Sequence, residues 1–510
     1  MMYLRTTLLT LIFLCLHVYG SFAQEWRQTV DYQIDVRLDD QAHNIQARER
    51  VQYVNRSPDT LKKIYFRLPW HGRVLQVSAK YTVFAVQQNG IAIDFKVLET
   101  ALHPSMPPQS LSQSLLEVIL SRPLLPGDAD VYNIAWQADV PNFSGGCGRN
   151  SPSGVDYTFS RWYPQACVYD RLGWHLGSPF DPDFSSEFGS YKVDITLSPK
   201  FMIAATGTLA NADAIGYGYE NQGVTAKPNY GLVTVWKFQA DQVQDFAWVA
   251  DPEFVHEKEQ YRDGLWLHSF YFKNKDQLAG LKNELSDFER AAYRYPYPQL
   301  SAVEEGELRT EIPMLVFSGK SIPEMTSAIS WDFQEIPMKS SYMLKQFRYV
   351  LGDEAFKKGL NAIMRRYLYA RPPVEECIHL FERSSGMELD WLQEQSSSLP
   401  AQVDYGIQSV KSEGSGTAVT LERLRGTILP VVLEVRYADA SVEQHYIPVE
   451  FLRAEGPAGY QGVLEPVWPF TTKTYTLKLS RPSSMIEYIA IDPEGLSGDV
   501  NPENNRKDMK

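Results

Sequence analysis

Cysteine, histidine and long apolar runs are all scarce in this sequence. The chain has 510 residues but only 4 cysteines and 9 histidines, and no histidine occurs between His268 and His379. A cysteine content this low excludes a scaffold that depends on many disulfides. Beyond the N-terminus, no stretch approaches the ~20 apolar residues that a membrane-spanning helix needs, so stable membrane insertion is not expected.

Positive charge is also in the minority, with 49 lysines and arginines against 62 aspartates and glutamates and a net charge of −13. Nucleic acids and anionic membranes attract proteins with an excess of positive charge, so neither is an expected partner. The sequence has no GxSxG nucleophile elbow and no P-loop. The GYG at Gly216–Gly218 lacks the spacing of a dinucleotide-binding loop.

The first residues have the order of a signal peptide. A basic residue precedes an apolar run from Leu8 to Val18, and the small residues Ser21 and Ala23 follow at the spacing that a signal peptidase reads. We therefore expect residues 1–23 to be removed and the mature protein to be periplasmic or secreted. A retained membrane anchor is the alternative.

Three of the four cysteines remain after that cleavage, because Cys15 lies within the signal peptide. An odd number in an exported chain allows at most one internal bridge. Cys147 and Cys167 are near in sequence, whereas Cys377 is far from both, so Cys147 and Cys167 form the candidate disulfide. Burial of both as small apolar side chains is the alternative.

Residues 24–255 have the pattern of a large all-β domain. Apolar residues from Val30 to Leu38 alternate with polar ones, and short strands follow between turn clusters. Large aromatic residues, among them Trp162 and Tyr163, are expected to pack in its core.

Two phrases identify this domain further. They read RWYPQACVYDRLGWHLGSPFDPDFSSEFGSYKVDITLSPKFMIAATGTLAN at 161–211 and VWKFQADQVQDFAWVADPEF at 235–254. The WYP, YD, GWH, EFG, ATG and ADP elements resemble the N-terminal β-saddle domain of bacterial M1-family zinc aminopeptidases. The resemblance implies a multidomain α+β protein with an exopeptidase ancestry.

A helical segment follows at 256–396. Leu278, Leu281, Leu285 and Phe288 fall on one helical face, and a short strand is expected at 300–303. In the family, this helix and strand open the catalytic domain, and a glutamate of the next strand holds the free amine of the peptide.

The resemblance matches that glutamate to Glu311. The two glycines that let a substrate approach the family's strand are replaced here by Leu308 and Arg309. Side chains at these positions are expected to obstruct the cleft.

The metal motif of the family is missing from the sequence. A catalytic zinc needs three protein ligands and one open position, which the family supplies from an HExxH helix and a glutamate on the next helix. No HExxH occurs anywhere. The resemblance resumes in a helix pair at 336–372, where Pro337 stands at the position of the oxyanion-stabilising tyrosine. We interpret this as deletion of the zinc-binding segment, and no zinc or other cofactor is expected.

Three sets of polar residues remain as candidate sites. His256 begins an HExxQ, for which a solvated strand end is the preferred interpretation, although a rearranged metal site could use His256, His268 or His379. Glu375, His379 and Glu382 share one helical face and could hold a cation, with an exposed polar face as the alternative. An acidic cluster could attract an amine or a cation, with a solvated loop as the alternative. Its members are Glu304, Glu305, Glu307 and Glu311.

The chain closes with strands at 397–510, after a linker expected at 396–400. Leu433, Val435 and Tyr437 alternate with polar residues, as a small β-sandwich requires. The predicted fold is an N-terminal all-β saddle domain, a truncated thermolysin-like helical domain and a C-terminal β-sandwich.

The predicted function is that of an exported, catalytically inactive M1-like protein that binds a peptide or a protein. Two alternatives stay open. One is an active zinc metallopeptidase with a rearranged metal site. The other is an inactive subunit of a complex with a catalytic relative.

Overall fold

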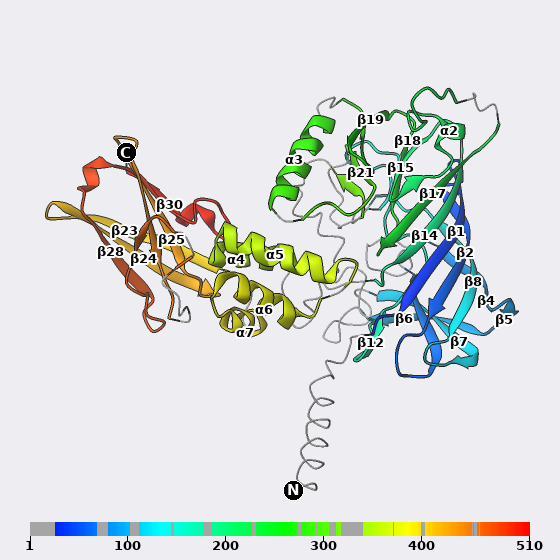
Figure 1. The fold of residues 1–510 in the computed structure, drawn as a ribbon, viewed down its shortest axis with the longest axis horizontal. Coiled ribbons are helices and arrows are strands. Elements are labelled where there is room, and N and C mark those ends of the chain that lie inside the picture. The colour runs from blue at the N-terminus through cyan, green and yellow to red at the C-terminus, as the bar shows by residue number, and fades with distance from the viewer. Residues whose placement is uncertain are drawn as a thin grey trace, which may run out of the picture.

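The computed structural model shows an α+β protein in which strands dominate and form several sheets (Figure 1). It describes residues 26–68, 80–101, 112–143, 147–176, 186–226, 231–273, 277–291, 293–304, 313–317, 340–370, 372–398, 403–450, 452, 456–457 and 460–509. The α+β fold class predicted from the sequence is confirmed. Among the described residues, none of the helices combines the length and the apolarity that crossing a bilayer requires.

An eight-stranded sheet is the backbone of the N-terminal body. Its strands, in spatial order, are β16 (Thr208–Leu209), β17 (Thr234–Val243), β14 (Gly189–Leu197), β1 (Thr29–Asp39), β2 (Asn44–Val54), β8 (Ala129–Asp139), β4 (Tyr81–Gln88) and β5 (Ile91–Ala92). The alternation predicted for β1 is confirmed, because Val30, Ile34 and Leu38 are all buried. Only one face of this sheet therefore contributes to the core.

Smaller sheets complete the N-terminal body. One contains β15 (Met202–Ala205), β18 (Trp248–Asp251), β10 (Tyr157–Phe159) and β9 (Gly148–Arg149). Another contains β11 (Gln165–Ala166), β3 (Leu61–Leu68), β7 (Ser112–Leu124) and β6 (Phe95–Ala101), and β12 (Tyr169–Asp170) pairs with β13 (Gly173–Trp174). A short helix, α2 (Ala212–Ile215), follows β16.

Aromatic rings fill the space between these sheets. Trp162 and Tyr163 are fully buried, and the indole N–H of Trp162 donates to the carbonyl of Phe246 at 2.9 Å. The ring of Phe159 stacks on that of Trp248, with centroids 3.9 Å apart. The expectation that the aromatic residues of this phrase serve core packing is confirmed for these two residues.

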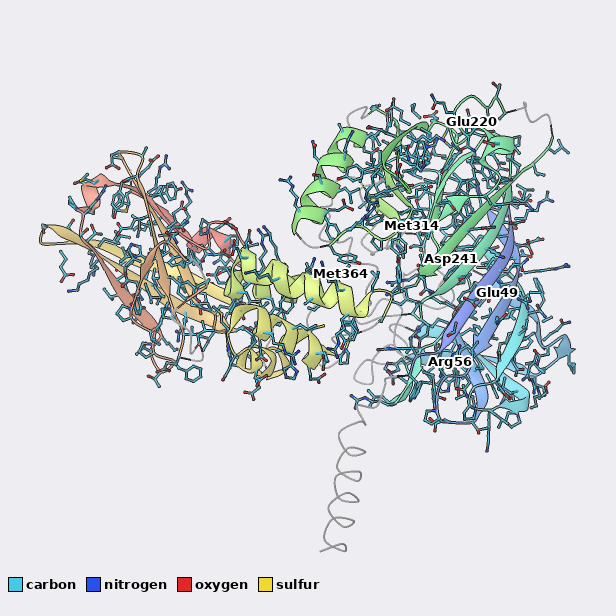
Figure 2. The ribbon with its side chains drawn as sticks, viewed as in Figure 1. Glu49, Arg56, Glu220, Asp241, Met314 and Met364 are labelled. Carbon is cyan, nitrogen blue, oxygen red and sulfur yellow. The ribbon has the colours of Figure 1, made fainter. Side chains whose placement is uncertain are left out.

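One buried residue of this core is ionisable. Glu49, in β2, is 2 % exposed, and neither carboxyl oxygen has a hydrogen-bond partner within the described chain (Figure 2). Burial raises the pKa of the Glu49 carboxyl well above its usual value, although the nearby indole of Trp136 acts in the opposite direction. Burial therefore favours the protonated, neutral form of Glu49.

A mixed four-stranded sheet follows. Its order is β19 (Val255–Arg262), β20 (Leu265–Tyr271), β21 (Gln299–Val303) and β22 (Leu315–Phe317), and β21 runs parallel to both neighbours. Helix α3 (Gln277–Ala291) connects β20 to β21. The predicted apolar face of α3 is confirmed, since Leu281, Leu285 and Phe288 are buried.

Four helices lie between the N-terminal body and the C-terminal sheets (Figure 1). They are α4 (Ser340–Leu351), α5 (Asp353–Tyr367), α6 (Val374–Ser385) and α7 (Asp390–Ser398). Gly359 lets α5 approach α6 closely, because a Cβ there would lie 2.4 Å from the ring of Phe381. Helix α7 extends into the expected linker. Gln395 helps to hold it there, since its Oε1 accepts a hydrogen bond from Ile428 N at 2.8 Å.

The C-terminal strands form two sheets. The first contains β23 (Val403–Glu413), β24 (Gly416–Gly426) and β28 (Thr474–Leu479). The second contains β27 (Val463–Leu464), β26 (Val442–Ile447), β25 (Val431–Tyr437), β29 (Ile486–Ile491) and β30 (Arg506–Asp508), with short 3-10 turns at Ser483–Met485 and Pro502–Asn504. The predicted alternation in β25 is confirmed, because Leu433, Val435 and Tyr437 are buried.

Candidate functional site

The predicted acidic cleft falls mostly outside the described residues. Glu305, Glu307 and Glu311 lie there, as do Leu308, Arg309 and Pro337. Glu304 is described and lies directly after β21. Its Oε2 accepts hydrogen bonds from the backbone N–H groups of Phe272, at 2.8 Å, and Lys273, at 3.2 Å. The carboxylate of Glu304 therefore anchors the chain that leaves β20.

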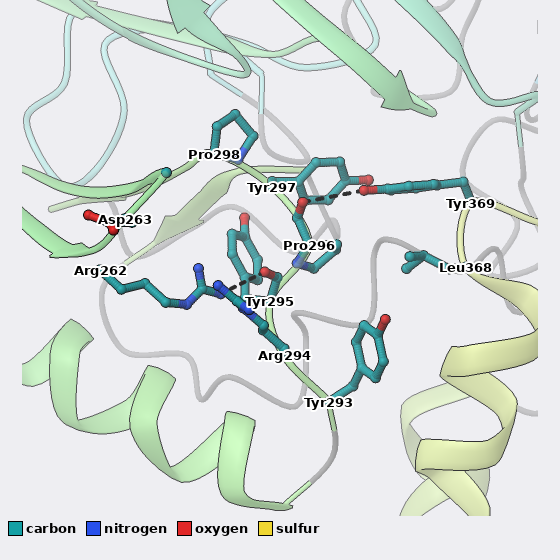
Figure 3. Close-up of a pocket in the computed structure, with 11 residues that line it drawn as sticks. Arg262, Asp263, Tyr293, Arg294, Tyr295, Pro296, Tyr297, Pro298, Leu368 and Tyr369 are labelled. Carbon is teal, nitrogen blue, oxygen red and sulfur yellow. Dashed lines mark hydrogen bonds between the residues drawn. The ribbon is translucent and has the colours of Figure 1, made fainter.

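A pocket that the sequence analysis did not predict lies where the chain enters β21 (Figure 3). Its volume is about 420 Å³. Three segments contribute to it: the β19–β20 turn, the connection from α3 to β21, and the end of α5. The lining residues are Arg262, Asp263, Gly264, Tyr293, Arg294, Tyr295, Pro296, Tyr297, Pro298, Leu368 and Tyr369. The dense YRYPYP run at 293–298 is the signal in the sequence that could have drawn attention to it.

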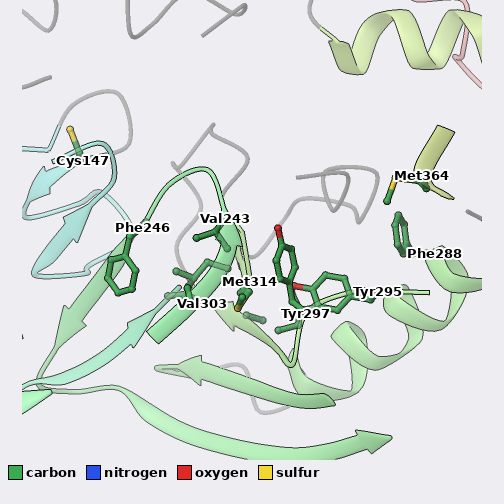
Figure 4. Packing of buried hydrophobic residues seen from close by; sticks show 14 of the residues in the cluster. Cys147, Val243, Phe246, Phe288, Tyr295, Tyr297, Val303, Met314 and Met364 are labelled. Carbon is green, nitrogen blue, oxygen red and sulfur yellow. The ribbon is translucent and has the colours of Figure 1, made fainter. Parts of the chain in front are cut away.

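The chain re-enters the described structure at Pro313 and Met314, which end the segment matched to the family's substrate strand. Met314 is 2 % exposed and has a left-handed backbone with φ of 64°. It lies with Val303 and Tyr297 among buried apolar side chains (Figure 4). The hydroxyl of Thr206 donates to the carbonyl of Pro313 at 3.1 Å, which joins the ATG turn of the N-terminal body to this strand.

The histidine of the HExxQ, His256, forms a hydrogen-bonded pair with His268, which lies outside that motif. His256 in β19 and His268 in β20 approach at 2.9 Å between Nε2 and Nδ1, and their rings are inclined by only 13°. The Nδ1 of His256 lies 2.8 Å from the carbonyl of Tyr217. Because a carbonyl only accepts, His256 carries its proton on Nδ1, and its Nε2 accepts the proton of His268 Nδ1.

The GYG segment explains how that carbonyl reaches His256. All three residues have left-handed backbone, with φ of 79° at Gly216, 56° at Tyr217 and 82° at Gly218. Gly218 also has no space for a side chain, because a Cβ there would lie 2.9 Å from Nδ1 of His256. The GYG segment and the HExxQ, to which the sequence analysis assigned no function, therefore contact each other at His256.

Both imidazoles of this pair are neutral at neutral pH. Burial lowers the pKa of His256 to about 4, and burial together with the neighbouring His256 lowers the pKa of His268 well below its usual value. The ring of Phe270 lies flat on His256, with centroids 4.4 Å apart. The interpretation of His256 as a solvated strand-end residue is therefore wrong, because desolvation and hydrogen bonding dominate its surroundings.

The third histidine of the rearranged-site alternative is remote from this pair. His379 is an exposed residue of α6, as is Glu375, whereas Glu382 is half-buried and its Oε1 accepts a hydrogen bond from Leu389 N at 2.8 Å. Within the part of the chain that the structure describes, no group of three His, Cys, Asp or Glu side chains is placed to hold a metal ion. A catalytic zinc needs three protein ligands. The described residues therefore do not fit a catalytic zinc ion.

The cysteines do not form the candidate disulfide in this structure. Cys147, Cys167 and Cys377 are all buried thiols. Burial raises the pKa of the Cys167 thiol, so this cysteine is an unreactive apolar side chain at neutral pH.

The elements define the fold class of the chain, an α+β protein with an N-terminal body of β-sheets, a mixed sheet, a group of helices and C-terminal β-sheets.

No family model and no curated protein matches the chain. The chain is similar to solved structures of the M1 zinc metallopeptidase from Deinococcus radiodurans, with 13 % identity, a TM-score of 0.45, and coverage of 73 % of this chain and 93 % of that chain. A variant of that enzyme bound to a Tyr-Ser-Ala substrate gives 12 % identity, a TM-score of 0.46 and the coverages 73 % and 93 %. Another structure of the same variant gives 12 % identity, a TM-score of 0.46, and coverage of 74 % of this chain and 95 % of that chain.

Proposed function

We propose that this chain is an exported M1-like protein that has lost aminopeptidase activity and binds a peptide or a partner protein. The observation that carries the proposal is the absence of HExxH from a sequence that otherwise resembles the family before and after that point. Without three ligands there is no route to a metal-bound water with a near-neutral pKa, which hydrolysis by this class of enzyme requires.

Two features of the fold support this proposal. Residues 161–211 carry the resemblance, and two of their aromatic side chains, Trp162 and Tyr163, are buried and pack in the core. The two histidines of the mixed sheet, His256 and His268, are hydrogen-bonded to each other, and His256 is also bonded to a backbone carbonyl. Neither observation requires the chain to retain hydrolysis.

The test is the zinc content of the mature protein, purified without chelators or a polyhistidine tag and measured by elemental mass spectrometry. We expect zinc near background, together with no release of amino acids from unblocked peptides. Stoichiometric zinc would overturn the proposal.

The alternative of a rearranged metallopeptidase site would require the hydrogen bond between His256 and His268 to break, so that their nitrogens could bind a metal. If zinc is found, substitution of His256, His268 and His379 in turn identifies the ligands. A third possibility, an inactive subunit of a catalytic relative, predicts a larger complex and co-purifying peptidase activity in size analysis of the native protein.

A further inference from the structure

The pocket at the start of β21 places positive charge beside apolar surface. Two of its lining residues, Arg262 and Arg294, are cationic, and one, Asp263, is acidic. A volume of about 420 Å³ lies within the range typical of small-ligand sites. The chemistry of the walls therefore decides what kind of ligand the pocket can accept.

Arg262 is held rigidly at the pocket wall (Figure 3). Its Nη2 donates to Oε1 of Glu289 at 2.7 Å and to the carbonyl of Tyr295 at 2.9 Å. Oε1 of Glu289 also accepts from the backbone N–H of Tyr295 at 2.8 Å, which closes the arrangement. The Nε of Arg262 is buried and has no acceptor among the described residues. The guanidinium is thus fixed in place by Glu289 and adds positive potential at the wall of the pocket, not an accessible donor.

Arg294 supplies a second cation. Its side chain is exposed, and among the described residues no carboxylate pairs with it. An exposed arginine contributes little to folding, but it offers a planar fork that matches a carboxylate.

Apolar side chains form part of the remaining wall. Pro296, Pro298 and Leu368 line the pocket together with the ring of Tyr369. Tyr369 has a left-handed backbone with φ of 58°, and its hydroxyl donates to the carbonyl of Pro296 at 3.4 Å. A bulky residue in this backbone conformation is strained by roughly 1 kcal/mol or more, and such strain gathers at ligand sites.

We propose that this pocket binds a carboxylate that is attached to an aromatic or branched aliphatic group. Arg294 recognises the carboxylate and Arg262 adds positive potential beside it, while the proline, leucine and tyrosine side chains cover the apolar part. Inorganic phosphate would use the charge but leave the apolar walls without a partner. Two sources have this chemistry, the C-terminus of a peptide and a free organic acid. None of the lining residues belongs to the predicted cleft or to a catalytic motif, so the proposal does not depend on whether the chain hydrolyses peptides.

Titration calorimetry on the full mature chain tests the proposal with four probes. They are N-acetylphenylalanine, the tripeptide Ala-Ala-Phe, the same tripeptide as its C-terminal amide, and inorganic phosphate. We expect the two acids to bind, and the amide and phosphate to bind at least about tenfold more weakly, because the charge-assisted hydrogen bonds or the apolar contacts are lost. A tripeptide that binds more tightly than N-acetylphenylalanine identifies a peptide terminus as the ligand, and the reverse order identifies a free acid.

Substitutions with opposite expected signs exclude an effect through unfolding. Arg294→Gln should weaken binding of both acids about tenfold or more, whereas Asp263→Asn should strengthen it a few-fold by removing a like charge. Both residues are exposed, so neither change should disturb the fold. Arg383→Gln, at an exposed position near the far end of α6, is the matched control and should change nothing. No binding at millimolar concentration, or binding unchanged by Arg294→Gln, would overturn the proposal.

Discussion

At the residue scale, Glu49 is the clearest departure from an ordinary core. A carboxyl group in such a buried position is favoured in its protonated form, because the charged form loses its hydration. Its pKa is raised in the folded state relative to the unfolded value of about 4.5. The resulting stability is fully present below that unfolded value and is lost as the pH rises through the folded pKa.

We therefore expect Glu49→Gln to reduce the fall in the free energy of unfolding that wild type shows as the pH rises. Wild type should lose up to about 1.4 kcal/mol for each pH unit between the two pKa values, whereas glutamine has no charge to bury. Urea unfolding at pH 5 and pH 8, followed by tryptophan fluorescence, measures the difference. The exposed Glu503→Gln serves as the control and should keep the wild-type profile. Equal pH dependence in wild type and Glu49→Gln would refute this account.

Gly218 offers a second prediction at this scale, with a matched control nearby. Gly218 and Gly223 have almost the same backbone, with φ of 82° and 83°, but a Cβ would meet His256 only at Gly218. Changing either to alanine should cost about 1–2 kcal/mol for the left-handed backbone. Gly218→Ala should cost a further ~1 kcal/mol or more, because the added carbon displaces the imidazole. Thermal unfolding of the two variants compares the costs, and equal costs would show that the contact with His256 is not restrictive.

At the element scale, the histidine pair holds a loop onto a hairpin. Segment 212–226 contacts the β19–β20 hairpin through the Tyr217 carbonyl on His256, and through Lys258, whose Nζ donates to the carbonyls of Tyr219 at 2.7 Å and Glu220 at 2.8 Å. Both histidines have depressed pKa values in the folded state. The stability that they contribute is present above about pH 6.5 and is lost as the pH falls through about 4.

Acidification should therefore loosen segment 212–226 before the strands around it. Hydrogen exchange measured at pH 7 and pH 5, corrected for the intrinsic rates, should show reduced protection of this segment at the lower pH. His379→Gln, which changes the exposed histidine of α6, should behave as wild type. His256→Phe should show weaker protection already at pH 7 and less change on acidification. Protection that does not depend on pH in wild type would contradict this prediction.

The elements themselves follow from local patterns, but the sites between them do not. The alternation in β1 and β25 and the apolar face of α3 predict their buried sides, because each pattern has the period of its own element. The pairing of His256 with His268 depends on the register of β19 against β20 and on the carbonyl of Tyr217, which is 39 residues away from His256 in sequence. The pocket of Figure 3 needs three separate segments. Contacts between such distant segments leave no periodic pattern in the sequence, so they could not be predicted from it.

At the scale of the whole molecule, the hydrogen bonds group the helices with the C-terminal sheets. The hydroxyl of Tyr349 in α4 accepts from Val432 N at 3.0 Å, and Gln346 donates to the carbonyl of Ser497 at 3.1 Å. The helices meet the N-terminal body at Tyr369, whose ring lies 5.7 Å from that of Tyr297 and whose hydroxyl is 3.4 Å from the carbonyl of Pro296. The contact at Tyr369 consists of one long hydrogen bond and a ring contact, so we expect it to couple unfolding more weakly than the shorter bonds from α4 to the C-terminal sheets.

The chain should therefore unfold as at least two cooperative units. Tyr349→Phe leaves the Val432 N–H without its acceptor, which should lower the free energy of unfolding by about 1–3 kcal/mol. We expect this destabilisation only in the helices and the C-terminal sheets. Hydrogen exchange followed through a urea titration resolves the units by segment. Tyr349→Phe should shift the transition of residues 340–509 and leave β1 and β2 unchanged, while Glu49→Gln should do the reverse. If both substitutions moved all segments together, the molecule would be a single cooperative unit, and the contacts at Tyr369 would couple its halves more strongly than their geometry indicates.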